Sequence, residues 1–209
     1  MLSGGSTPEP IYRRIADSGV VAGEGLYLLV SDERLVPLGS SDANRTMIEP
    51  MAEAIGLPKE RRIMVEHDAP PVEAAQRYHE ALTQLNALGV SRHLALLGIG
   101  TDGHTASIFD RRSATEPHTE LAATVDKEAG FRRVTATPEE ILSYKRLIFL
   151  APGAKKREIM GALFRDPADY PAGLLAGRHS RSELWTDIYP VQPGVPQDSG
   201  GGDAPGGNR

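Results

Sequence analysis

The apolar residues of this chain fall into short continuous runs that alternate with longer segments of mixed polarity. We interpret four of the runs as buried strands, at residues 26–30, 63–65, 93–97 and 147–150. The mixed segments space their apolar residues as helices do, and we expect helices over residues 8–16, 44–55, 72–88, 138–142 and 155–164. This alternation is typical of a mostly parallel sheet with helices on both faces, so the pattern predicts an α/β fold.

Local signals refine three of the expected helices. Thr7 and Thr137 each precede a proline, which places a capping hydroxyl directly before a residue suited to the first helical position. Glu140 then completes a capping box with Thr137. Pro50 has no N–H group and crowds the preceding turn, so we expect it to divide its helix into two pieces.

The chain has two parts of different character. Residues 1–192 have the length and apolar content of one α/β domain. From Pro193 onward the sequence is rich in Pro, Gly, Ser and Asp and has almost no apolar residue. Such a segment cannot bury enough surface to offset its ordering entropy, so we expect residues 193–209 to form a disordered tail.

The composition narrows the class of protein. Cysteine is absent from the 209 residues, which excludes disulfides and thiolate metal sites and agrees with a reducing compartment. No run is long enough to span a membrane, and a net charge of −5 argues against broad nucleic-acid binding. We expect a cytoplasmic monomer that binds a small molecule, with neither nucleic acid nor a membrane as a partner.

A glycine-rich segment, Ser3-Gly4-Gly5-Ser6-Thr7, precedes the first expected helix. Its glycines allow a tight turn close to a ligand, and the first N–H groups of a helix suit a phosphate. The three hydroxyls would add donors. The alternative is an ordinary turn, and the segment is not a Walker loop because it has no lysine at its end.

Four polar residues, 31–34, follow the strand expected to end at Val30. In open α/β sheets, ligands gather beyond the carboxyl ends of strands. Arg34 suits a phosphate through its planar guanidinium, with Asp32 or Glu33 holding that group in place. The alternative is a solvated loop with a local ion pair.

The run 97–107 also follows a strand and holds the most informative chemistry. His104 stands in a glycine-rich turn two residues after Asp102, and a histidine titrates near neutral pH. It can therefore take a proton from water and return it to a leaving oxygen. Asp102 either orients the imidazole or holds the turn. A dinucleotide site on Gly98, Gly100 and Gly103 is a weaker alternative. A metal site is also weaker, because no third ligand has a suggestive spacing.

Two basic positions complete the candidate residues. Arg133 precedes the helix expected at residues 138–142, and Lys156 follows the strand expected at residues 147–150. Each is also compatible with an ordinary solvated surface charge. The place of Lys156 after a strand favours a role at the site.

Together these segments resemble the 6-phosphogluconolactonase family, a relative of glucosamine-6-phosphate deaminases and ribose-5-phosphate isomerases. The matching pieces span most of residues 2–187 in the expected order: 2–8, 31–37 with Asn44, 97–109, 133–137, 153–156, and Trp185 with Asp187. The run 100–107 is the most specific. Deaminases share its Asp-Gly-His core but differ at Ala106-Ser107, and they carry tyrosine at the position of Arg34. Those two differences favour a lactonase.

The resemblance implies a Rossmann-like α/β fold and hydrolysis of 6-phosphogluconolactone in the oxidative pentose phosphate pathway, without a cofactor or a metal. It implies that His104 is the general base, with Asp102 beside it. The residues that it places around the substrate and its phosphate are Ser3, Gly4, Gly5, Ser6, Thr7, Asp32, Arg34, Asn44, Gly100, Gly103, Arg133 and Lys156. N–H groups of the Gly98–Gly103 turn are candidate donors to an oxyanion.

Two rival functions stay open on the sequence alone: a sugar-phosphate deaminase or isomerase on the same fold, and a non-catalytic fragment that binds sugar phosphates. Members of the family usually have a helix and a central strand before the glycine loop, which this chain lacks. We therefore expect an N-terminally truncated fold whose gene product begins upstream of Met1, and a chain that is poorly soluble or unstable as given.

Overall fold

The computed structural model describes residues 1–125 and 130–188, so the tail expected at residues 193–209 lies outside the described part. One three-stranded sheet is parallel, with the order β4 (Leu94–Gly98), β7 (Arg146–Leu150), β8 (Ser182–Trp185). A second parallel pair joins β1 (Leu28–Leu29) to β3 (Arg62–Ile63). Leu2 lies between the two groups, with parallel bridges to Val30 and Leu96. The predicted parallel α/β arrangement is confirmed.

A third sheet is antiparallel and was not predicted. It has the order β2 (Asp32–Arg34), β6 (Arg133–Ala136), β5 (Ala122–Val125). Residues 32–34, which we expected in a loop, form the edge strand β2. They pair with residues about a hundred positions later in the chain, and their own polar sequence gives no strand pattern.

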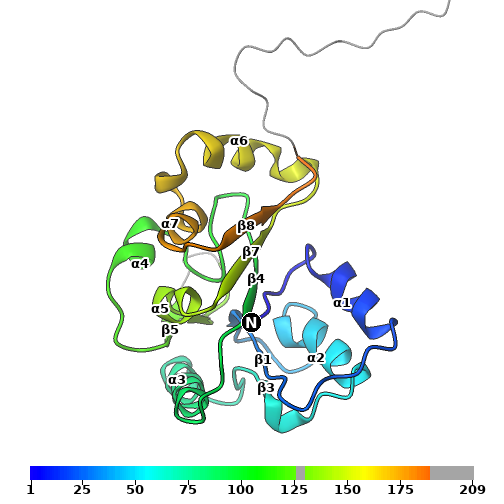
Figure 1. The fold of residues 1–209 in the computed structure, drawn as a ribbon. Helices are drawn as coiled ribbons and strands as arrows, with labels where there is room; N and C mark the ends of the chain where they lie inside the picture. The colour runs from blue at the N-terminus through cyan, green and yellow to red at the C-terminus, as the bar shows by residue number, and fades with distance from the viewer. Residues whose placement is uncertain (126–129, 189–209) are drawn as a thin grey trace, which may run out of the picture.

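The helices lie on both sides of the strands, as expected (Figure 1). Helices α1 (Glu9–Ala16) and α2 (Asn44–Ala54) cover one side; α4 (Arg111–Thr115), α5 (Pro138–Leu142) and α7 (Pro171–Arg178) lie on the other. Helix α3 (Pro71–Ala87) packs against β5, and α6 (Arg157–Arg165) lies beyond β8. Short 3-10 turns occupy Lys59–Arg61, Ala154–Lys156 and Pro167–Asp169.

Pro50 does not divide its helix, contrary to the sequence prediction. Helix α2 continues through it as one element of 11 residues. Ile48, Met51 and Ala52 are all buried on this helix, which packs against α1. That apolar contact outweighs the single backbone hydrogen bond that proline removes.

The predicted side-chain caps are also wrong. Helix α1 begins at Glu9, after Pro8, without a side-chain cap, so Thr7 does not fill that role. The hydroxyl of Thr137 donates to the carbonyl of Glu120, 3.0 Å away. Glu140 does not reach back to the helix start, because its carboxylate is buried against the guanidinium of Arg92 at 2.7 Å. In both cases a partner far along the chain replaces the local one.

Candidate active site at the carboxyl ends of the strands

The turn that follows β4 is closed by its own backbone. The N–H of Gly100 donates to the carbonyl of His104 at 2.8 Å, and the N–H of Gly103 donates to the carbonyl of Gly100 at 3.1 Å. Gly103 has a φ of +82°, which a residue with a side chain rarely adopts. The N–H groups of Gly100 and Gly103 are therefore already bonded inside the turn, and neither is available as the oxyanion donor that the sequence analysis expected.

The imidazole of His104 lies over Gly100 and bonds to Asp102. Its Nδ1 is hydrogen-bonded to Oδ1 of Asp102, and its backbone N–H approaches the same oxygen at 3.3 Å. A carboxylate only accepts hydrogen bonds, so Nδ1 carries the hydrogen and Nε2 is left to act as a base. Asp102 therefore fills both of the roles that the sequence left open: it orients the imidazole, and it holds the turn through the backbone N–H of His104.

The charge state of Asp102 suits this role. Burial alone would raise the pKa of Asp102, but the hydrogen bond and charge of His104 outweigh it, and the pKa is lowered. Lys156 lies at the same turn, with Nζ 2.5 Å from the carbonyl oxygen of Ile99. Burial lowers the pKa of Lys156, and the charge of Asp102 opposes that shift. The structure thus brings His104, Asp102 and Lys156 together at one turn.

Asp32 is the centre of a buried polar network beside this turn. Its Oδ1 accepts from the hydroxyl of Ser31 at 2.9 Å, and its Oδ2 accepts from the hydroxyl of Ser107 at 2.7 Å. Arg133 approaches Oδ2 with Nη1 at 3.7 Å. The N–H of Ser107 donates to the hydroxyl of Thr135, 3.1 Å away. Asp32 therefore fixes the run after His104 to strands β2 and β6.

Two arginines face each other across the antiparallel ladder. Arg34 on β2 and Arg133 on β6 are direct partners in its register. The Nε atom of each is buried and has no hydrogen-bond partner. Burial lowers the pKa of Arg133; Asp32 opposes the shift and Arg34 adds to it. Like charges directly opposite one another are unfavourable in a sheet, so this pair is suited to an anion placed between them.

The guanidinium of Arg34 is not held by the carboxylate of Asp32 or of Glu33, contrary to the sequence expectation. Its Nη1 donates instead to the backbone carbonyl of Asp42 at 3.2 Å, and the guanidinium lies 5.8 Å from the ring centre of Phe131. Neighbouring residues of a strand point to opposite faces of the sheet, so the side chain of Glu33 faces away from the guanidinium of Arg34 and accepts only from its backbone N–H. Asp32 shares the face of Arg34, but its carboxylate accepts from the hydroxyls of Ser31 and Ser107.

The glycine loop meets the site through Ser3 and Gly4. The hydroxyl of Ser3 is buried and without a partner, and it lies close to Gly98 at the end of β4. A methyl group on Gly4 would lie 2.0 Å from Oδ1 of Asn44, so only glycine fits there. Asn44 in turn donates from Nδ2 to the carbonyl of Asp32 at 2.7 Å. Gly5 has a φ of +98° and turns the loop toward α1.

Ser6 and Thr7 are the two loop residues that stand apart. Ser6 is exposed and Thr7 is half-buried in the turn before α1. No hydrogen bond of either side chain joins them to the polar network around Asp32. Their place at the start of α1 keeps them compatible with a phosphate at that end of the helix.

Phe109 is a site residue that the sequence analysis missed. Its ring centre lies 4.6 Å from that of His104, and the guanidinium of Arg133 lies 5.4 Å from the same ring centre. Contact with one ring brings the candidate base and the paired arginines into one site. An aromatic residue five positions after the histidine was the available signal, but it does not say what the ring contacts.

Within residues 1–125 and 130–188, no three His, Asp or Glu side chains gather in a way that would hold a metal ion. In the same residues no helix combines the length and apolar character needed to cross a membrane.

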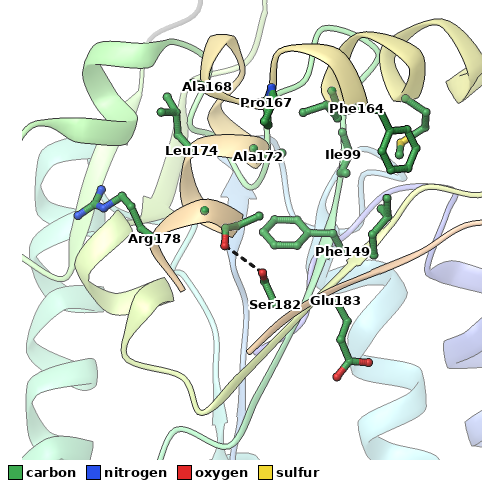
Figure 2. A pocket seen from close by; sticks show the side chains of 16 residues that line it. Ile99, Phe149, Phe164, Pro167, Ala168, Ala172, Leu174, Arg178, Ser182 and Glu183 are labelled. Atoms are coloured by element: carbon green, nitrogen blue, oxygen red, sulfur yellow. Dashed lines mark hydrogen bonds between the residues drawn. The ribbon is translucent and has the colours of Figure 1, made fainter. Parts of the chain in front are cut away.

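An apolar cavity lies next to Ile99, at the start of the turn that holds His104, and it does not suit a sugar phosphate. It has a volume of about 480 Å³ between α6, α7 and β8. Figure 2 shows the ring of Phe149 pointing into this cavity, whereas the charged ends of Arg178 and Glu183 point away from it. A phosphate would meet no cation there, so we place the active site at the charged network instead.

Known proteins resemble this chain over most of its length. The profile of the family described as Glucosamine-6-phosphate isomerases/6-phosphogluconolactonase matches residues 1–185. The chain is 27% identical over 198 residues to the 6-phosphogluconolactonase of Haemophilus influenzae, covering 91% of this chain and 85% of the relative. It is 32% identical over 180 residues to the 6-phosphogluconolactonase of Synechocystis sp., covering 82% and 74%.

A solved structure agrees with these relatives. The crystal structure of 6-phosphogluconolactonase from Thermotoga maritima matches with a TM-score of 0.71 at 26% identity, over 88% of this chain and 82% of that one. Sequence similarity and fold similarity therefore both extend over most of the chain. The chain belongs to the family of glucosamine-6-phosphate isomerases and 6-phosphogluconolactonases.

Proposed function

We propose that this protein hydrolyses 6-phosphogluconolactone to 6-phosphogluconate, the lactone-opening step of the oxidative pentose phosphate pathway, with His104 as the general base. The observation that carries this proposal is the shared contact of His104 and Arg133 with Phe109. This contact supports the proposal because it brings the imidazole of His104 close to Arg133, one of the two arginines that we propose bind the phosphate. A phosphorylated lactone presents a carbonyl carbon, which water would attack beside His104, and a phosphate, which the two arginines would bind.

The reaction begins with a water molecule next to Nε2 of His104. As the water oxygen bonds to the lactone carbonyl carbon, Nε2 takes one of its protons. The ionised carboxylate of Asp102 stabilises the resulting imidazolium through Nδ1. When the bond from the carbonyl carbon to the ring oxygen breaks, Nε2 returns the proton to that oxygen. The products are a carboxylic acid and the freed sugar hydroxyl, and the acid then ionises.

The phosphate would lie between Arg34 and Arg133. Their buried, unpartnered Nε groups are donors that a phosphate oxygen could satisfy. Asp32 holds Arg133 from the other side, while the hydroxyl of Ser3 is a further free donor at the glycine loop. We propose that Lys156 binds the substrate from the side of the catalytic turn, where its Nζ lies.

The remaining candidates would shape the site through their backbones or their packing. Gly4 allows Asn44 to close on the loop, Gly100 makes room for His104, and Gly103 supplies the turn. We propose that Gly5, Ser6 and Thr7 line the loop around the substrate, without assigning a bond to any of them.

The test is direct. Purified protein is mixed with freshly generated 6-phosphogluconolactone, and acid release is followed after subtraction of spontaneous hydrolysis. We expect turnover well above background. Glucosamine 6-phosphate with ammonia detection is the parallel assay, and ammonia release without lactone hydrolysis would show a deaminase. Cell fractionation tests the further proposal that the protein is cytoplasmic, which rests on the absence of cysteine and of a long apolar run. Light scattering tests the proposal that it is a monomer.

A further inference from the structure

A buried histidine lies behind the phosphate side of the site. His67 follows β3, and its side chain is 2% exposed. Its Nδ1 lies 2.7 Å from the carbonyl oxygen of Val36, in the segment after β2. A carbonyl only accepts hydrogen bonds, so Nδ1 carries a hydrogen and donates it to Val36.

The other ring nitrogen of His67 faces a carboxylate. Nε2 lies 3.6 Å from Oε2 of Glu33, whose side chain is fully buried, and it has no hydrogen-bond partner. At 3.6 Å the two atoms are too far apart for a hydrogen bond but lie within the distance of an ion pair, so Nε2 is the ring atom that faces the buried carboxylate.

The pKa of Glu33 agrees with this arrangement. Burial raises the pKa of Glu33, and it does so against the backbone N–H groups of Asn44, Arg45 and Arg34 and the charge of His67. The groups that face the carboxylate come from α2, from β2 itself and from the segment after β3. On β6, the charge of Glu33 acts on Arg133.

Glu33 connects the histidine to the substrate side. Its Oε1 accepts from the backbone N–H of Arg34 at 2.8 Å and of Asn44 at 2.6 Å, and its Oε2 accepts from that of Arg45 at 2.8 Å. The two bonds to Asn44 and Arg45 hold the start of α2. Asn44 then fills the space beside Gly4. The carboxylate therefore ties together the strand of Arg34, the start of α2 and the glycine loop.

We infer that His67 is a positioning residue for phosphate binding: its bond to Val36 and the close approach of its Nε2 to the carboxylate of Glu33 hold Arg34 and Asn44 in their binding geometry. His67 itself does not touch the substrate. The inference rests on the proposed function, because it assumes that the phosphate lies at Arg34. It assigns a role to a buried pair that the hydrolysis steps do not use.

Two amide variants separate the two contacts of the ring. In His67→Asn the amide nitrogen takes the place of Nδ1, so the bond to Val36 is kept and the contact with Glu33 is lost. In His67→Gln the amide nitrogen takes the place of Nε2, so Glu33 keeps a donor that cannot titrate. His93→Asn is the matched control, because His93 is exposed at the start of β4.

The readouts are KM and kcat with the phosphorylated lactone, and the Kd of 6-phosphogluconate. Leaving a buried carboxylate without its partner weakens the site, so we expect His67→Asn to raise KM and Kd by roughly 10-fold, with kcat within about twofold of wild type. His67→Gln should stay within about threefold of wild type near neutral pH.

Equal KM and Kd for His67→Asn and wild type would overturn the inference. A fall in kcat as large as the rise in KM would overturn it too. A ¹⁵N spectrum of the wild-type imidazoles tests the bond from His67 to Val36 without any variant. We expect the Nδ1 signal of His67 to show the bound hydrogen that this bond requires. An Nδ1 without a hydrogen would overturn the inference. Failure of wild type to bind 6-phosphogluconate would instead contradict the proposed function.

Discussion

Gly100 leaves open the space that the imidazole of His104 occupies. A methyl group at position 100 would lie 2.1 Å from Nδ1 of His104 and 2.5 Å from Oδ1 of Asp102. The geometry of the candidate base therefore depends on the absence of a side chain two residues before Asp102. The bond from the N–H of Gly100 to the carbonyl of His104 holds the two residues in that contact.

The first prediction follows from this contact. Gly100→Ala should displace the imidazole and lower kcat by about 100-fold, because a shift of about 1 Å in a reacting group can cost that much. Unfolding temperature should change little. Gly161→Ala is the control, since its added methyl group would meet only Arg165 Nη1 at 3.6 Å. Wild-type kcat in Gly100→Ala would show that the His104–Asp102 geometry is not needed.

The second prediction concerns the base itself. General-base catalysis typically contributes 10²–10⁴-fold, so His104→Gln should lower kcat by roughly that factor. KM should change little, because the proposed phosphate contacts come from Arg34 and Arg133. The assay must subtract spontaneous lactone hydrolysis at each pH. If the variant keeps more than about a tenth of the wild-type kcat, His104 is not the general base.

The third prediction concerns the paired arginines. Arg34→Ala and Arg133→Ala should each cost roughly 1.5–3 kcal/mol of substrate binding, the range for hydrogen bonds to a charged group. The loss should be much smaller with the unphosphorylated lactone. Arg112→Ala is the control, because the Arg112 side chain is 81% exposed on α4. Equal losses on both substrates would mean that the arginines support the fold and do not bind phosphate.

The fourth prediction concerns a buried ion pair away from the site. Arg92 and Glu140 are 5% and 1% exposed at the side chain. Glu140→Ala leaves the guanidinium of Arg92 buried without its partner, so we expect the free energy of unfolding to fall by about 3–5 kcal/mol. Replacing both residues by leucine should lower the free energy of unfolding by clearly less than Glu140→Ala does. Urea unfolding measures both effects, and equal losses in the single and double variants would contradict this account.

The fifth prediction is the pH dependence of the same pair. Burial raises the pKa of Glu140, although the hydrogen bond and charge of Arg92 oppose the shift. A raised folded-state pKa means that the folded protein holds this proton more tightly than the unfolded chain does. The resulting stabilisation is complete below the ordinary glutamate pKa and is lost as pH rises through the folded-state value. Glu140→Gln should lack this loss, as urea titrations between pH 4 and 7 would show.

Much of the fold follows from local sequence. The runs at residues 93–97 and 147–150 became β4 and β7, because a strand covered on both faces needs a continuous apolar sequence. Helices α3 and α5 lie within a residue of their expected bounds. The antiparallel strands were missed because β2 carries Asp32, Glu33 and Arg34, and a polar triplet has no alternating pattern. Its strand geometry depends on pairing with β6, far along the chain.

In the candidate site, too, the local relationships followed from the sequence and the long-range ones did not. The sequence by itself determined that His104 and Asp102 share a glycine turn after a strand, because the hydrogen bonds that close this turn on itself join residues no more than four positions apart. Only the tertiary structure decided that Arg34 lies opposite Arg133, that Phe109 joins base and arginines, and that His67 faces Glu33. Those relationships depend on strand register and on burial of distant segments, and no local pattern encodes either one.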